Sequence, residues 1–378
     1  MTQSVVVLGG GIIGLSCAFE AARRGMKVTL VEPGGLGGQA SGAAAGMLAP
    51  YSENPEQPDD FFKLCLYSLN RYPEWIEAVE ELSGISAEWV RSGSINVFLH
   101  EADLLPVDSR IRWQNQWGAE AELLDAAQLR KLEPSLTHEA AAGLYTPGES
   151  HVYAPKLVTA LIAACTRLGV TLLEQAGEIR EVKVHADGGA AVKAAGLDRP
   201  VLGDRLVVCA GAWTGAYERW FGLSLPIHPI RGQICSFDHS QAEVRHMVFS
   251  SQAYWVGKKN GSLVCGASED VAGFQTSVTE RGIGRLLRSS EKLLPFLKGK
   301  EPLHRWAGLR PATRDGLPLL GQAEDTGTVI MAAGHYRNGI LLSPATAAVV
   351  ADLLEEKPAD IRLDRFAPDR FTTAGLRR

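Results

Sequence analysis

The sequence has few charges, no paired cysteines and no long apolar run. Charged residues make up 21% of the chain, the net charge is -5 and no Lys/Arg cluster occurs, so we expect neither nucleic acid nor a membrane surface as a partner. No apolar run reaches the roughly 18 residues of a membrane span. The first run, Val5 to Ile13, leads into a helical pattern and not into a cleavage site. We therefore expect a cytoplasmic protein without a signal peptide.

The cysteines argue against a metal site and against dithiol chemistry. None of them forms a C-x-x-C pair, so buried reduced thiols are the simpler interpretation and we predict no metal. The six positions are Cys17, Cys65, Cys165, Cys209, Cys235 and Cys265. With 378 residues, 46% of them hydrophobic, and 40 glycines, the composition is typical of a well-packed enzyme rich in tight turns. Domains usually contain roughly 100–200 residues, so we expect two.

The N-terminus predicts a strand, a glycine turn, a helix and a second strand. Ser4 to Leu8 is a short apolar run, and the sequence GGGIIG at 9–14 follows it directly. Apolar residues then recur at helical spacing from Ile12 until Gly25, and a second apolar run covers Lys27 to Val31. This order within about 30 residues predicts a βαβ unit of the dinucleotide-binding kind.

Each glycine of the G-x-G-x-x-G pattern has a physical role in this unit. Gly9 allows the tight turn, Gly11 lets the backbone approach a pyrophosphate, and Gly14 allows close packing of helix and strand. The helix N-terminus favours a diphosphate through its free N–H groups and dipole. Glu32 ends the second strand, where its carboxylate can accept from ribose hydroxyls and would repel a 2'-phosphate. A glycine-rich turn without a ligand is the alternative, but the combination favours a bound nucleotide.

Residues 34–46 are almost entirely Gly and Ala, and we predict no regular element there. A chain with so few side chains can run close to a ligand, so we interpret this segment as a cofactor loop. Such a loop suits an extended FAD, and no nicotinamide-type second domain is visible. On the residues alone, FAD is favoured and NAD remains open.

The remaining pattern alternates between two domains. We predict helices at Phe61 to Leu82, Ala121 to Leu132, Pro155 to Leu168 and Ile340 to Leu354. We predict strands at Ser94 to Leu99, within Leu172 to Val184, at Arg205 to Ala210, within Val248 to Ala267 and at Thr328 to Ala332. From this order we assign residues 1–82, 150–218 and 304–365 to an FAD-binding domain, residues 83–149 and 219–303 to a substrate-binding domain, and residues 366–378 to a C-terminal tail.

Three segments carry a resemblance to a known family: GGQASGAAAGML at 37–48, WAGLRPAT at 306–313 and GHYRNGIL at 334–341. The chain resembles the flavin-dependent family that includes D-amino acid oxidase and monomeric sarcosine oxidase, and within it the glycine oxidases of thiamine biosynthesis. The resemblance covers nearly the whole chain. It implies an α/β fold, with an FAD-binding Rossmann-like domain and a second, mainly antiparallel β-sheet domain for the substrate.

The resemblance also implies which residues hold FAD. To the motif glycines it adds Ile12, Ile13, Glu32, Pro33, Ala40 and Ser41 at the adenosine and diphosphate, Glu178 at the adenine, and Gly211 after a buried strand. Beside the flavin ring it places Ala45, Gly46, Met47, His335, Tyr336, Arg337, Asn338, Gly339, Ile340 and Leu341. Relatives with covalent flavin use a Cys near Gly308 or a His near the N-terminus. Residues 302–321 contain no Cys and residues 1–99 contain no His, so we expect FAD to be bound non-covalently.

Four residues are candidates for binding the substrate. Arg310 is expected to hold a carboxylate through its guanidinium fork, with an ion pair as the alternative role. Arg337 is placed near the substrate, with a structural salt bridge as its alternative. Tyr254 resembles a family tyrosine that contacts the carboxylate, and Met47 could cap the pocket, although each is by default a packing residue.

The implied reaction is the oxidation of glycine, and less readily of sarcosine or small D-amino acids, to an imine. The imine hydrolyses to glyoxylate and ammonia, while oxygen reoxidises the flavin and gives hydrogen peroxide. No side chain is required as an acid or base, because catalysis rests on orientation and on the flavin. The resemblance also implies a homotetramer. The alternatives are a D-amino acid dehydrogenase that reduces a quinone, and a flavin-binding module without turnover.

Overall fold

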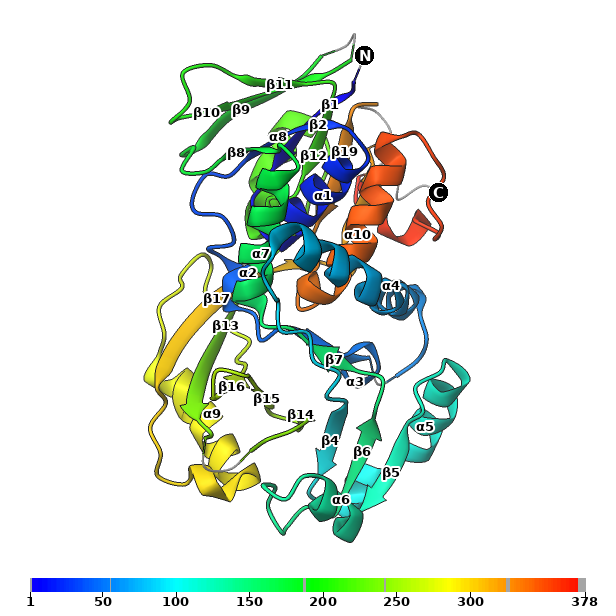
Figure 1. Ribbon diagram of the computed structural model, residues 1–378, viewed down its shortest axis with the longest axis vertical. Helices are drawn as coiled ribbons and strands as arrows, with labels where there is room; N and C mark the ends of the chain where they lie inside the picture. Colours follow the sequence, from blue (N-terminus) through cyan, green and yellow to red (C-terminus); the bar gives the residue numbers. More distant parts are fainter. Residues whose placement is uncertain (1, 55, 186–187, 241–242, 324–326, 373–378) are drawn as a thin grey trace.

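The computed structural model describes residues 2–54, 56–185, 188–240, 243–323 and 327–372. Two large sheets lie at opposite ends of the long axis, and short elements lie between them (Figure 1). This arrangement confirms the expected α/β fold with a second, mainly antiparallel sheet. Among the described helices, none is long and apolar enough to cross a membrane.

The first sheet has six strands in the order β18-β19-β12-β1-β2-β8. All neighbours pair in parallel except β18 and β19. Its strands are β1 (Ser4–Leu8), β2 (Lys27–Val31), β8 (Thr171–Leu173), β12 (Arg205–Val208), β18 (Leu319–Gln322) and β19 (Val329–Ala333). The central strand β1 is buried on both faces, which explains its unbroken run of Val and Leu.

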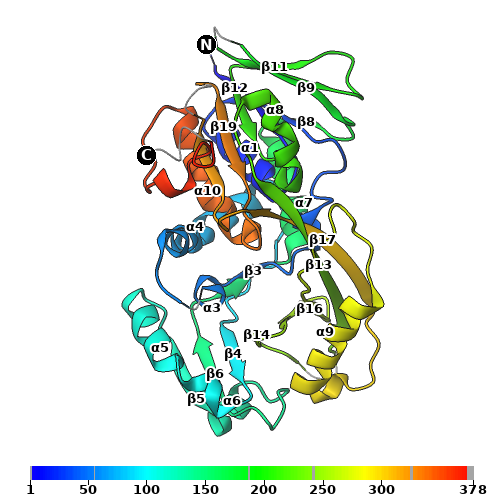
Figure 2. The same cartoon turned by 180° about the vertical axis from the view of Figure 1, so that it is seen from behind.

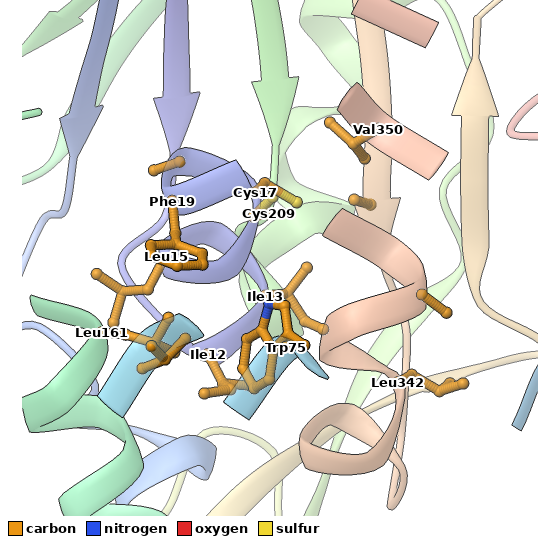
Figure 3. Close-up of a cluster of buried hydrophobic side chains, with 14 of the residues drawn as sticks. Ile12, Ile13, Leu15, Cys17, Phe19, Trp75, Leu161, Cys209, Leu342 and Val350 are labelled. Carbon is orange, nitrogen blue, oxygen red and sulfur yellow. The ribbon is translucent and has the colours of Figure 1, made fainter. Parts of the chain in front are cut away.

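Helices α1 (Ile12–Arg23) and α10 (Gly339–Leu354) pack on one face of this sheet, and α4 (Asp60–Ser83) and α7 (Ala154–Arg167) pack on these two helices. Figure 3 shows Ile13, Trp75 and Leu342 among the side chains that meet in the core they enclose. Helix α10 is apolar on nearly all sides because it is buried on nearly all sides. The other face is covered by α8 (Glu218–Phe221) and by a small sheet of β9 (Ile179–Val184), β10 (Ala190–Ala194) and β11 (Val201–Gly203).

The second sheet has eight strands in the order β17-β13-β16-β15-β14-β4-β6-β5. Only β14 and β4 pair in parallel among its described neighbours. Its strands are β4 (Ser94–Phe98), β5 (Glu122–Asp125), β6 (Ala142–Thr146), β13 (Ile227–Asp238), β14 (Met247–Phe249), β15 (Tyr254–Gly257), β16 (Ser262–Gly266) and β17 (His304–Thr313). The accompanying helices are α5 (Val107–Gln116), α6 (Ala126–Leu132) and α9 (Glu280–Leu293).

Short elements connect the two sheets. They are α2 (Ala40–Ala43), β3 (Met47–Leu48), α3 (Pro50–Glu53) and β7 (Ser150–His151). Figure 2 shows β3 and α3 in the zone between the two sheets, and β3 pairs there with β7. The cofactor loop predicted at 34–46 therefore continues into the middle of the molecule.

Two expectations about local structure are wrong. Residues 34–46 do contain a regular element, α2, because their alanines form a helical turn closed by the Ala43 N–H on the Gln39 carbonyl, at 3.3 Å. The helix expected at Ala121 to Leu132 begins only at Ala126, and the preceding residues form β5. Asp125 accepts from the Ala127 and Gln128 N–H groups, and this capping box fixes where the helix starts.

The expected domain boundaries differ from the sheets at two places. Residues 304–313, which we assigned to the FAD-binding domain, form β17 at the edge of the second sheet. Phe366, where the tail was expected to begin, is buried in the core of the first sheet. Residues 373–378 of that tail lie outside the described residues.

Candidate functional site

A cavity of about 690 Å³ runs from the glycine turn of the first sheet to the edge of the second. This volume lies in the range of small-molecule and cofactor sites. At one end it is lined by Gly9, Gly11 and Glu178, and at the other by Tyr254 and Arg310. The cavity therefore brings together residues that were assigned to cofactor and to substrate.

The glycine turn after β1 depends on the absence of side chains. Gly9 has a φ of +111°, and a Cβ there would overlap the Cys209 carbonyl oxygen. A Cβ on Gly14 would overlap the Gly9 carbonyl oxygen. Gly14 does not line the cavity, so its role is the close packing of helix and strand. Gly11 does line the cavity, and a Cβ at this position would approach only the Ser41 hydroxyl, at 3.2 Å.

The N-terminus of α1 offers hydrogen-bond donors to the cavity. The Ile12 N–H donates to the Ser41 hydroxyl at 2.8 Å, but in the described parts of the chain nothing accepts from the N–H groups of Gly11 and Ile13. Both residues line the cavity, as do Ala40 and Ser41. Free N–H groups at the positive end of a helix suit an anion. The residues present therefore fit the diphosphate of a dinucleotide.

Glu32 has a structural role that the sequence did not reveal. One carboxylate oxygen accepts from the Gly10 N–H at 2.6 Å and the other from the Gly34 N–H at 2.8 Å. The carboxylate thus ties the glycine turn to the cofactor loop. Glu32 also lines the cavity, and each carboxylate oxygen can accept a second hydrogen bond, so the ribose role remains open to it.

Three further residues assigned to the adenosine end also line the cavity: Pro33, Glu178 and Gly211. The Glu178 carbonyl oxygen accepts from the Ala195 N–H at 2.9 Å, and its side chain is exposed. Its backbone is therefore fixed beside the cavity.

A buried lysine holds the loop at Ala45, Gly46 and Met47, all three of which line the cavity. The Lys258 Nζ donates to the Ala45 carbonyl at 2.7 Å and to the Val152 carbonyl at 2.9 Å. Burial lowers the pKa of Lys258 to about 7. This contact ties the strand end after β15 to the loop assigned to the flavin ring.

The N-terminus of α10 forms another wall. His335, Tyr336, Arg337, Gly339 and Ile340 line the cavity. The His335 ring is buried with Nε2 at 3.0 Å from the Thr346 hydroxyl, and burial lowers its pKa to about 3, so it is neutral at ordinary pH.

The other two residues predicted in this segment do not line the cavity. Asn338 is the N-cap of α10, and the Leu341 carbonyl accepts from the Ser68 hydroxyl at 2.6 Å. Among the described residues we find no acceptor for the N–H groups of Gly339 and Ile340. This helix end therefore also presents positive partial charge toward the cavity.

Arg310 lies on β17 with its guanidinium directly against Gly232 of β13. Its Nη1 donates to the Ser268 carbonyl at 3.0 Å. No carboxylate of the described residues lies within 4 Å of it, so the ion pair considered as its alternative role is not present there. The guanidinium is half-buried, lines the cavity and retains donors for an anion.

Arg337 does form ion pairs, as its alternative role required. Its Nη2 lies 3.2 Å from a Glu53 carboxylate oxygen and its Nη1 lies 3.2 Å from a Glu269 oxygen. The Tyr336 hydroxyl donates to the same Glu269 oxygen at 2.9 Å. The Glu53 charge beside it raises the pKa of Arg337 above its already high ordinary value.

Tyr254 and Met47 lie on the cavity wall near these arginines. Tyr254 is 8% exposed, and burial raises the pKa of its phenol to about 12 although Arg310 and Arg337 act in the opposite direction. It is therefore a neutral donor. No hydrogen-bond partner of its hydroxyl occurs within the described ranges. Met47 packs with the apolar side chains around Tyr254.

Sequence reasoning missed several cavity residues and supports. Gly232 carried a signal, because a glycine inside a strand indicates the close approach of another group. Glu53 and Lys258 carried none, since their partners lie far away in the sequence. Trp213, Arg219 and Trp220 also line the cavity and were not predicted.

The fold and the cavity are those of a dinucleotide-binding protein in which a separate sheet lines the end of the cavity opposite the glycine turn. A family model described as FAD dependent oxidoreductase matches residues 4–353. The chain belongs to this family of FAD-dependent oxidoreductases.

Individual relatives point in the same direction. A glycine oxidase of Geobacillus kaustophilus is 33% identical over 372 residues, which cover 97% of this chain and 96% of the relative. A bifunctional protein ThiO/ThiG of Trichormus variabilis is 32% identical over 385 residues, covering 98% of this chain and 55% of its own length.

Two solved structures are similar over nearly their whole length. The crystal structure of glycine oxidase from Geobacillus kaustophilus has a TM-score of 0.92 at 32% identity, with 98% of this chain and 99% of that chain covered. The crystal structure of iminodiacetate oxidase from Chelativorans sp. BNC1 has a TM-score of 0.87 at 25% identity, with 96% and 98% covered.

Proposed function

We propose that this protein oxidises the amine of glycine, and less readily of sarcosine or small D-amino acids, with non-covalently bound FAD and molecular oxygen. The products are the imine, and from it glyoxylate and ammonia, together with hydrogen peroxide. The observation that carries the proposal is the Arg310 guanidinium, which lines the cavity without a carboxylate partner among the described residues. A half-buried, unpaired guanidinium suits a substrate carboxylate.

FAD, when bound, supplies the acceptor for the two electrons and the hydrogen that leave the substrate. The side chains of this protein orient the substrate. Arg310 binds the carboxylate, and the Tyr254 hydroxyl, held neutral by its raised pKa, donates a second hydrogen bond to it. Two contacts on the carboxylate fix its position and restrict the orientations of the Cα–H bond, and this restriction is the main contribution expected of the protein.

The other candidates for a catalytic base are occupied. His335 is buried and neutral at its hydrogen bond to Thr346, and Glu53 is paired with Arg337. We therefore assign no acid or base. The free N–H groups of Gly339 and Ile340 at the start of α10 are proposed to stabilise negative charge on the reduced cofactor.

The proposed setting is the cytoplasm, as part of thiamine biosynthesis and as a homotetramer, because the sequence resembles glycine oxidases of that kind. We retain the division into an FAD-binding and a substrate-binding domain as part of the proposal. The cavity lining from both sheets supports it.

A peroxide assay on the purified yellow protein with glycine, sarcosine and D-alanine tests the proposal. We expect peroxide with all three and the highest kcat/KM with glycine. Reduction of the flavin by these substrates without peroxide in air would indicate a dehydrogenase that uses another acceptor, such as a quinone. No reduction by any amine would indicate a binding module.

A further inference from the structure

The two arginines at the substrate end of the cavity differ in their carboxylate partners. The charged side chains that act on Tyr254 are Arg310, Arg337 and Glu53. Arg337 also faces Glu269, so its guanidinium has two carboxylates, whereas Arg310 has none among the described residues. Two arginines therefore line the same end of the cavity, but only Arg310 retains guanidinium donors without a carboxylate partner among the described residues.

Glu53 is the inner partner of Arg337. Its side chain is 10% exposed and lines the cavity, whereas the Glu269 side chain is 48% exposed and does not line it. An ion pair shielded from water is stronger and less screened by salt than one at the surface. Glu53 is thus the partner with the larger influence on what Arg337 can bind.

The backbone that carries Glu53 is held in place by a buried carboxylate. The fully buried Glu149 carboxylate accepts from the Tyr51 N–H at 2.7 Å and the Ser52 N–H at 2.9 Å, which holds the start of α3. The Ser52 hydroxyl donates to the same carboxylate at 2.6 Å. Glu53 therefore reaches Arg337 from a rigid turn.

The two arginine segments are also held beside each other. The Tyr336 N–H donates to the Pro311 carbonyl at 3.0 Å, and these residues adjoin Arg337 and Arg310. Because Arg310 and Arg337 both act on Tyr254, a second carboxylate on a substrate bound at Arg310 would lie close to Arg337. There it would find both ends of the fork occupied and would meet the negative charge of Glu53.

We propose that Glu53 is a specificity-determining residue that neutralises Arg337 and so restricts the site to amino acids with a single carboxylate. This inference rests on the proposed amino acid oxidase function and adds a rejected substrate class, the dicarboxylic amines such as D-aspartate and iminodiacetate. Two effects disfavour a second carboxylate: the negative charge of Glu53 repels it, and the Arg337 guanidinium, already paired, does not attract it. Removing the Glu53 charge converts Arg337 into a second anion subsite.

The test compares Glu53→Gln with Glu269→Gln, a matched control that removes the same charge from the outer partner. Binding of acetate and malonate is followed by the perturbation of the flavin absorbance, and kcat/KM is measured for glycine and D-aspartate. In Glu53→Gln we expect the ratio of malonate to acetate affinity, and the ratio of D-aspartate to glycine kcat/KM, to rise on the order of 10-fold or more. Glu269→Gln should raise both ratios less.

A double variant shows whether the gain passes through Arg337. In Glu53→Gln/Arg337→Met the gain for malonate and D-aspartate should disappear. The FAD content and the melting temperature of each variant are checked first. If Glu53→Gln does not fold, Glu53→Ala is used in its place, because it removes the same charge.

Unchanged ratios in Glu53→Gln and Glu53→Ala, or a gain that survives the loss of Arg337, would overturn the proposal. Because the acetate and malonate titrations need no turnover, they test Glu53 even if glycine proves not to be a substrate.

Discussion

Gly232→Ala is expected to impair substrate binding without touching the substrate. Gly232 lies on β13, where its neighbour across the strand pair is Gly308 of β17, two residues from Arg310. A Cβ on Gly232 would stand 2.5 Å from Cζ and from Nη2 of the Arg310 guanidinium, closer than carbon atoms of real side chains approach. The guanidinium must therefore move.

The size of the effect follows from this distance. Ordinary contact begins at 3.4 Å, so the guanidinium must shift by about 0.9 Å from its 2.5 Å position. A misplacement of about 1 Å in a positioning group can lower the rate on the order of 10²-fold. The end of an arginine moves easily, so we expect the free energy of unfolding to change by less than about 1 kcal/mol.

The assay measures kcat/KM for glycine, the affinity for acetate, FAD content and the melting temperature of Gly232→Ala. The expected result is a large loss of kcat/KM and of acetate affinity in a protein with normal FAD content and stability. Gly148→Ala is a matched control, since Gly148 lies in a turn after β6 of the same sheet, with nothing near its Cβ position and without a positive φ. Parent-like acetate binding by Gly232→Ala would refute the assigned role of Arg310.

Three further variants test other parts of the site. Arg310→Lys keeps the charge but loses the fork, and should lower kcat/KM for glycine by roughly 30- to several-thousand-fold, about 2–5 kcal/mol, at normal FAD content. Glu32→Ala should weaken FAD binding, measured by titration of the apoprotein, and should also destabilise that apoprotein by about 1–3 kcal/mol, because the Gly10 and Gly34 N–H groups lose their acceptor. Lys258 has a pKa of 10.5 when unfolded and about 7 when folded, so its destabilising effect is complete below pH 7 and is relieved as the pH rises toward 10.5. Urea unfolding at pH 7 and pH 9 should therefore show the parent gaining stability relative to Lys258→Met at the higher pH, and a constant difference would contradict the assigned burial.

The cofactor end of the fold could be read from the sequence because its signals are local. β1, the glycine turn, α1 and β2 follow one another, and strand length and helical spacing predicted them almost to the residue. The helices α4, α7 and α10 were predicted for the same reason. The capping box at Asp125 was an equally local signal, and overlooking it placed a helix where β5 lies.

The substrate end could be predicted only in part because distant segments build it. Arg310 and Tyr254 were found through the resemblance, and the structure places both on the cavity wall. The partner of Arg337 is 284 residues away at Glu53, and Gly232 meets Arg310 only because β13 and β17 pair. No periodicity or short motif encodes such contacts, so the pairing of the Arg337 charge with Glu53 can be found only in the folded structure.

The most direct measurement is an anaerobic titration of the purified, FAD-loaded protein with glycine. We predict that the visible flavin absorbance disappears as glycine is added, that glyoxylate and ammonia appear in equal amounts, and that air restores the colour with formation of peroxide. The proposed function would be contradicted if glycine, sarcosine and D-alanine all left the absorbance unchanged while dithionite still reduced the flavin of the same protein.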